Sequence, residues 1–165
     1  MKNFNPLSIH YNVMVQSVCA SLFGYWYNFD VTSNGDSVDT LEKVTQIFNS
    51  TGRVKVWSGG SENTIFDSPE INHAFRAWHD FHHITKGLPF TPQGEILVAQ
   101  EQCKDIVRLY GESTQSEYFM NILKADVIGQ TEYLTKHDSY VKDQKGFTEA
   151  YLKNPLEAVN SGLFH

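Results

Sequence analysis

Four histidines fall within eleven residues of one segment, and an aspartate accompanies them. Residues 70–83 read EINHAFRAWHDFHH and contain His73, His79, His82, His83 and Asp80. Imidazole nitrogens and carboxylate oxygens are common ligands of divalent transition metals, and two histidines four residues apart on a helix can hold one ion. Imidazole also titrates near neutral pH, so a histidine can transfer protons. We expect metal or catalytic use of part of this cluster, with a structural or surface role as the alternative.

A helix through this segment would separate the cluster into two faces. At about 100° per residue, one apolar face contains Ile71, Ala74, Phe75, Trp78 and His82. An adjacent polar stripe contains Asn72, Arg76, His79 and His83. We therefore expect His82 at the edge of the core. His79 and His83 would lie one turn apart on a face that can border a cavity.

One metal-site template is that of a zinc peptidase. The sequence His79-Asp80-x-x-His83 resembles the H-E-x-x-H helix with Asp in place of Glu. In such proteases a glutamate on the next helix is the third ligand and an aspartate supports it, positions that Glu101 and Asp105 would take here. Two features count against this alternative. The general-base glutamate is shortened, and Glu101 lies opposite the apolar face of its expected helix.

A second pattern is formed by three segments together, the first of which begins at His79. In HDFHHITKGLPFTP, Gly87, Thr91 and Pro92 follow His79. A later segment, LKADVIGQTEYL, contains Asp126, and an early apolar segment, SIHYNVMVQSV, offers His10. Together these segments resemble the HD-domain metal-dependent phosphohydrolases, particularly the small 5′-deoxynucleotidase or dNTP phosphohydrolase-like members. Small enzymes of this family are common in bacteriophages.

The resemblance implies a metal-dependent phosphohydrolase that acts on a nucleotide or another small phosphoester. It implies His10, His79, Asp80 and Asp126 as ligands of one divalent ion, drawn from Zn, Mn, Co, Ni or Mg. Such an ion would lower the pKa of bound water and neutralise charge on the phosphoryl oxygens. The gap from His10 to His79 is long for the family, so residues 30–67 are expected to be an insertion.

Two acidic positions of the family are replaced in this chain. His83 stands where an acid usually follows His-Asp, and Leu88 stands at the acidic position of the next loop. We expect His83 to transfer protons in place of that acid, assisted by Glu95 at the start of the next helix. Arg76 and Lys86 are the expected phosphate contacts. These departures also favour an alternative of another class: a non-enzymatic binding or host-takeover protein with a structural histidine cluster.

The elements that would position these residues are mainly helices. Apolar spacing predicts helices over about 9–29, 40–51, 68–84, 94–110 and 115–137. Ser68-Pro69-Glu70 is a typical helix start, and Gly87 a typical stop. The Gly-rich SGGSE between RVKVW and NTIF predicts a small irregular or β-hairpin insertion around 53–66. We expect a mainly α, HD-domain-like helical bundle in one domain over 1–137, with a C-terminal tail, 138–165, packed on it.

Composition limits the function classes. With 13 basic and 19 acidic residues among 165, the chain has a formal charge of −6, which argues against binding to duplex nucleic acid or anionic lipid. Cys19 and Cys103 form no CxxC motif, as expected for reduced thiols. No apolar run is long enough to span a membrane, and Met1–Pro6 lacks a signal-peptide pattern. We expect a cytoplasmic protein whose partner is a small phosphorylated molecule, with a homo-oligomer left open.

Overall fold

The computed structural model describes residues 6–24 and 28–165, and these are mainly helical. The helices are α1 (Ile9–Phe23), α2 (Leu41–Thr51), α3 (Pro69–Lys86), α4 (Pro92–Tyr110), α5 (Thr114–Lys124), α6 (Gln130–His137), α7 (Gln144–Lys153) and α8 (Pro155–Asn160). The other elements are a 3₁₀ turn, η1 (Gly35–Ser37), a π-helical turn, η2 (Ala125–Gly129), and the strands β1 (Phe29–Thr32) and β2 (Val54–Trp57). The predicted mainly α fold with a small insertion is confirmed. Residues 1–5 and 25–27, which the signal-peptide and first-helix predictions include, lie outside the described residues.

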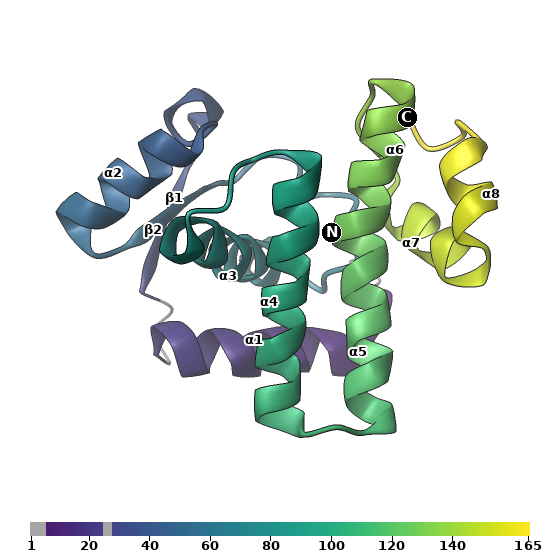
Figure 1. The fold of residues 1–165 in the computed structure, drawn as a ribbon, viewed down its shortest axis with the longest axis horizontal. Helices are drawn as coiled ribbons and strands as arrows, with labels where there is room; N and C mark the ends of the chain where they lie inside the picture. The colour runs from purple at the N-terminus through teal and green to yellow at the C-terminus, as the bar shows by residue number, and fades with distance from the viewer. Residues whose placement is uncertain (1–5, 25–27) are drawn as a thin grey trace.

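Helix α3 carries the histidine cluster and packs against α1, α4 and β2 (Figure 1). It begins at the predicted cap, and it ends at Lys86, two residues beyond the predicted end and next to the predicted stop at Gly87. Oγ of Ser68 accepts a hydrogen bond from the amide of Ile71, Pro69 occupies the first turn, and Gly87 closes the helix with φ 64°. Glycine adopts this left-handed conformation without steric strain. The buried face, which includes the fully enclosed Trp78, sets the rotation of α3 and so fixes where its polar stripe points.

Helices α4 and α5 lie side by side, and α5 continues through η2 into α6 as one long rod (Figure 1). The predicted helices at 94–110 and 115–137 are confirmed in type. Helix α4 begins two residues early, at Pro92, because Oγ1 of Thr91 caps it by accepting a hydrogen bond from the amide of Gly94. The π turn η2 interrupts the second helix at Ala125–Gly129. Such turns occur often at functional sites, and this one contains Asp126.

The strand pair differs from the predicted hairpin. Strand β2 pairs in parallel with β1, with Phe29 opposite Val54 and Thr32 opposite Trp57. Helix α2 supplies the crossover that parallel strands require. Helix α1 correspondingly ends at Phe23, short of the predicted residue 29, because Phe29 begins β1 and packs edge-on against Phe23. A strand partner this distant in sequence leaves no local periodic signal, so the hairpin alternative was wrong. Residues 58–66 are irregular, as the other alternative predicted.

Among the described residues, the apolar interior forms two clusters. The larger cluster is formed mainly by α1, α3, α4 and α5. The smaller contains Tyr133, Val141, Phe147 and Ala158 and joins α7 to η2 and α8 to α6. The domain boundary at residue 137 stays a prediction. No helix within the described ranges has the length and apolar character needed to cross a lipid bilayer.

Candidate functional site

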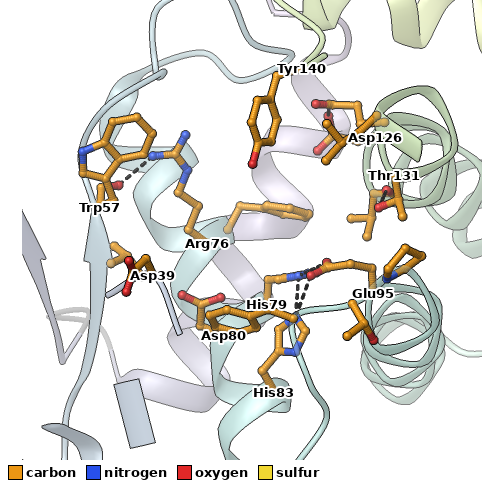
Figure 2. A pocket seen from close by; sticks show the side chains of 18 of the residues that line it. Asp39, Trp57, Arg76, His79, Asp80, His83, Glu95, Asp126, Thr131 and Tyr140 are labelled. Atoms are coloured by element: carbon orange, nitrogen blue, oxygen red, sulfur yellow. Dashed lines mark hydrogen bonds and ion pairs between the residues drawn. The ribbon is translucent and has the colours of Figure 1, made fainter. Parts of the chain in front are cut away.

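A pocket of about 600 Å³ is bordered by α3, α4, η2, α6 and the end of β2. Six of the eight residues that the sequence predicts for the site line it: Arg76, His79, Asp80, His83, Glu95 and Asp126. Figure 2 shows these side chains around a common space, with contributions from three different elements. A pocket of this volume suits a small molecule. The structure therefore brings most of the predicted site together, while the individual roles stay predictions.

His79 and His83 lie one helical turn apart on α3 with their rings facing each other. Nε2 of His79 is 3.0 Å from Nε2 of His83. The carboxylate of Glu95, in the first turn of α4, lies against both rings. Its Oε2 is 2.7 Å from Nε2 of His79, and its Oε1 is 3.2 Å from Nε2 of His83. Two imidazoles and one carboxylate therefore converge on a single small space (Figure 2).

The other ring nitrogens already have partners. Nδ1 of His79 donates to Oε1 of Gln102 at 3.0 Å. Nδ1 of His83 donates to the backbone oxygen of Leu88 at 2.8 Å. His83 is fully buried, and its ring also packs edge-on against Phe90. These contacts fix the orientation of both rings from behind.

The electrostatics of this cluster depend on the contact between His79 and Glu95. Burial alone would lower the pKa of His79, but the hydrogen bond and negative charge of Glu95 outweigh it and raise the pKa to about 9. Burial would raise the pKa of Glu95, but hydrogen bonds from His79 and His83 hold it below its ordinary value. Without a metal ion the site therefore holds an imidazolium against a carboxylate. A divalent cation at the same place would displace that proton.

Besides the exposed Asp39, which pairs with Lys43, two further carboxyls line the pocket. Burial raises the pKa of Asp80 to about 6, against the opposing charges of His79 and His83. Burial also raises the pKa of Asp126 to about 7, although Nε2 of Gln130 donates to its Oδ1 at 2.7 Å. A carboxyl that titrates near neutral pH can act as a general acid or base.

Arg76 forms another wall of the pocket, and its guanidinium is held in place by the loop after β2. Nη1 donates to the carbonyl oxygens of Trp57 and Gly59, both at 2.6 Å, and Nη2 donates to that of Gly60 at 3.3 Å. The guanidinium also lies 5.7 Å from the centroid of the Trp57 ring. These partners are neutral, so they orient Arg76 without neutralising its charge. An anionic group entering the pocket would therefore be attracted to this wall.

The donor set of α3 fits a divalent transition metal. Within residues 6–24 and 28–165, His79, Asp80 and His83 each offer one ligand atom, and these three atoms lie within 4.8 Å of one another. Imidazole nitrogen with carboxylate oxygen is a combination that zinc and related first-row ions bind well.

His10 and Lys86 lie outside the pocket. His10 is exposed at the start of α1, because Tyr11 and Met14 belong to the buried face of that helix. Lys86 is exposed near the end of α3, with Nζ 3.8 Å from the carboxylate of Glu101. The structure therefore leaves one predicted ligand and one predicted phosphate contact apart from the other six residues.

Glu101 and Asp105, the further residues of the zinc-peptidase-like alternative, have partners other than His79 and His83. Glu101 forms ion pairs with Lys104 and Lys86. Asp105 is buried, and its Oδ2 accepts a hydrogen bond from Nε1 of Trp78 at 2.9 Å and lies 2.6 Å from Nε2 of His82. His82 is thus buried with a core partner, in agreement with its predicted place at the core edge.

Gln102 is a site residue that the sequence interpretation missed. It is fully buried and contacts His79. A signal for it existed, since Gln102 follows Glu95 by seven residues and so lies on the same face of α4 two turns later. Trp57 had no such signal, because its place beside Arg76 follows from the parallel strand pairing.

Comparison of the chain with protein-family models, curated proteins and solved structures found no match. The HD-domain resemblance therefore depends on the motifs quoted above.

Proposed function

We propose that this protein binds one divalent metal ion at the histidine cluster of α3 and hydrolyses a small phosphorylated substrate, a nucleotide in the first instance. The observation that carries the proposal is the combination within one pocket of about 600 Å³ of a histidine–carboxylate cluster and the guanidinium of Arg76. A cluster of this kind can hold a cation, and a guanidinium on another wall suits a phosphate. The sequence resemblance supports the same chemistry.

A bound divalent ion supplies a Lewis acid for the phosphoryl group and a lowered pKa for water at the site. The side chains of the chain divide the other tasks. His79 and His83 hold the ion. Arg76 binds and orients the phosphate. Asp126, with a pKa of about 7, accepts or returns a proton at its Oδ atoms.

The role of His83 changes from the one expected from the sequence. His83 is fully buried, and both ring nitrogens have partners among Leu88, His79 and Glu95. A group enclosed in this way is better suited to hold an ion than to exchange protons with substrate and solvent. Asp126 and Asp80 line the same pocket and titrate near neutral pH, so they take over the proton transfer in this proposal.

The test is release of inorganic phosphate from a panel of nucleoside mono-, di- and triphosphates. The protein is first stripped with a chelator and then resupplied with Mn²⁺, Co²⁺, Zn²⁺ or Mg²⁺ in turn. We expect hydrolysis that requires added metal. Arg76→Lys should lower kcat/KM by about 10- to 100-fold, mainly through KM, because the forked guanidinium is lost. Arg53→Lys is the matched control, since Arg53 pairs with Asp30 in the strand insertion and does not line the pocket.

Two results would replace this proposal. Cleavage of peptides or amides without phosphate release would favour the zinc-peptidase-like alternative. Stoichiometric metal binding with no hydrolysis of any phosphoester would favour a binding protein.

A further inference from the structure

We propose that the ion is coordinated by Nε2 of His79, Nε2 of His83 and the carboxylate of Glu95, with Asp126 outside the coordination sphere. The site is then of the zinc class, with two nitrogen ligands and one oxygen ligand. This assignment rests on the proposed function in taking the pocket as the place of the ion. It differs from the ligand set that the sequence resemblance implies, in which His10, Asp80 and Asp126 are ligands beside His79, and His83 and Glu95 are not.

The spacing of the three groups is close to that of a loaded site. In a tetrahedral zinc site with ligand bonds near 2.1 Å, neighbouring ligand atoms lie about 3.4 Å apart. The corresponding distances here are 3.0 Å between the two Nε2 atoms, 2.7 Å from His79 Nε2 to Glu95 and 3.2 Å from His83 Nε2 to Glu95. The groups need to separate by only about 0.2 to 0.7 Å to admit the ion. Small rotations of three side chains supply such a change.

The hydrogen bonds behind the rings select the atoms that face the ion. Nδ1 of His83 can bond to the carbonyl of Leu88 only as a donor, and Nδ1 of His79 donates to Gln102. A neutral imidazole that carries its proton on Nδ1 has its lone pair on Nε2. Once a bound cation has displaced the Nε2 proton of the His79 imidazolium, both lone pairs point toward Glu95. A hydrogen-bonded second ring nitrogen is the usual arrangement of histidines that bind metal ions.

The three ligands also come from rigid elements. His79 and His83 are one turn apart on α3, and Glu95 lies in the first turn of α4, which Thr91 caps. Three protein ligands leave a fourth position open, as in catalytic rather than structural zinc sites. Because all three residues line the pocket, that position is accessible to a substrate. Nitrogen-rich ligation favours Zn²⁺ or Co²⁺ over Mg²⁺ and Ca²⁺.

Asp126 is placed differently. Its Oδ1 accepts a hydrogen bond from Gln130 one turn further along the same rod, and it comes from η2 rather than from α3 or α4. Figure 2 shows its carboxylate on a separate wall of the pocket from the His79–His83–Glu95 cluster. This position suits contact with substrate or water more than contact with an ion held by the two histidines.

Metal binding alone tests the assignment, by calorimetric titration of the stripped protein with Zn²⁺ and with Co²⁺. We expect one ion per chain. Glu95→Gln and His83→Gln should each weaken affinity by more than about 100-fold, beyond the effect of removing an outer partner. Asp126→Asn should leave affinity unchanged. Glu101→Gln is the matched control on the same helix, since its carboxylate pairs with Lys104. Circular dichroism of each variant serves as the control that it is folded.

A second measurement uses the unaltered chain. In protein labelled with ¹⁵N-histidine, Zn²⁺ should shift the Nε2 resonances of two histidines while their Nδ1 atoms keep their protons. Loss of binding in Asp126→Asn together with full binding in Glu95→Gln would overturn the assignment in favour of the resemblance-based set. Absence of Zn²⁺ and Co²⁺ binding would overturn it as well. Tight binding with no phosphate release would overturn the proposed function and leave this assignment intact.

Discussion

Nε2 of His82 lies 2.6 Å from Oδ2 of Asp105, in a buried contact that joins α3 to α4. The indole of Trp78 donates to the same oxygen at 2.9 Å. His82 is the immediate neighbour of His83, yet it does not line the pocket. The adjacent histidines of α3 therefore divide between two tasks: His79 and His83 face the pocket, and His82 stabilises the packing of two helices.

The first prediction concerns Asp105 and stability in acid. Burial alone would raise the pKa of Asp105, but hydrogen bonds from His82 and Trp78 outweigh it and hold the pKa below its ordinary value. A carboxyl with a depressed pKa stabilises the fold above its unfolded pKa, and this stabilisation is lost as pH falls through the folded value. Asp105→Asn should lower the free energy of unfolding at pH 7 by about 1 to 3 kcal/mol. The difference from the unaltered protein should shrink below about pH 4, near the unfolded pKa.

Urea denaturation of the metal-free protein at pH 7 and at pH 3 measures this effect. Glu101→Gln is the control, because its ion pair with the exposed Lys104 should contribute little. An Asp105→Asn penalty that is the same at both pH values would contradict the electrostatic explanation.

How far the fold follows from the sequence depends on how local each signal is. The ends of α3 were predicted because Ser68, Pro69 and Gly87 each act on the backbone next to them. The pairing of Phe29 with Val54 was not predicted, because it depends on where α2 directs the chain. The π turn at Asp126 was not predicted either, because residues 115–137 were interpreted as one uninterrupted helix, whereas the extra residue of a π turn shifts the helical phase by about 100°.

The second prediction tests the approach of α4 to the loop before it. A Cβ atom added at Gly94 would lie 1.8 Å from the carbonyl oxygen of Pro89. This is a clash with backbone, which cannot rotate away. Gly94→Ala should therefore displace the start of α4, with a loss on the order of 1 to 3 kcal/mol, and should move the adjacent Glu95 away from His79. Gly52→Ala is not a suitable control, because φ at Gly52 is 69°.

Alanine substitution at Gln93, the preceding residue in the same turn, is the appropriate control. The thermal unfolding temperature and the Zn²⁺ affinity should both fall in Gly94→Ala and change little in Gln93→Ala. Unchanged stability and affinity in Gly94→Ala would show that the loop adapts to the added methyl group.

The site was predictable to the extent that it lies on one helix. Arg76, His79 and His83 share one stripe of α3, so their common direction followed from helical spacing. Asp80 lies further round the helix and was assigned to the site through the resemblance. The choice between Glu95 and Glu101 as the acid nearest the histidines depended on the rotation of α4. Six residues correspond to about 240° around a helix, so the two carboxylates lie on different faces of α4. Glu95 contacts the histidine pair, and Glu101 contacts Lys86 at the end of α3. His10 illustrates the limit, because neither its distance from α3 nor its exposure can be obtained from the order of motifs.

The third prediction concerns Gln102, which positions His79 without reaching the pocket. Its Oε1 accepts from Nδ1 of His79, while its Nε2 is buried without a partner among the described residues. Gln102→Leu removes both the Oε1 acceptor and the unsatisfied Nε2 donor. The cost of the lost hydrogen bond and the gain from removing the unsatisfied donor should nearly cancel in the free energy of unfolding. Zn²⁺ affinity should still fall by about 10- to 100-fold, as for other outer partners of metal-binding histidines.

Calorimetric titration and thermal unfolding, measured on the same Gln102→Leu sample, separate these two effects. Gln102→Glu should restore affinity, because a carboxylate oxygen can accept the same Nδ1 proton. A loss of stability that parallels the loss of affinity, or no rescue by glutamate, would show that Gln102 acts only through packing.

The last prediction concerns Asp126 and has the opposite sign to that of Asp105. Burial raises the pKa of Asp126 from 3.8 to about 7, despite the hydrogen bond from Gln130 and the nearby charges of His79 and Arg76. The folded chain therefore binds this proton more tightly than the unfolded chain, and stability falls as pH rises from about 4 through about 7. Asp126→Asn cannot ionise and keeps an Oδ1 that can accept from Gln130. The free energy of unfolding of the variant should equal that of the unaltered protein near pH 4. At pH 8 it should be higher by on the order of 2 to 4 kcal/mol, at about 1.4 kcal/mol per pKa unit. Urea denaturation of both proteins, measured in the presence of a chelator from pH 4 to pH 9, gives the difference in their free energies of unfolding. His79 titrates in both proteins, so its contribution to this difference largely cancels. A difference that does not change with pH would mean that Asp126 is ionised throughout, and the proton-transfer role proposed for it would then have no basis.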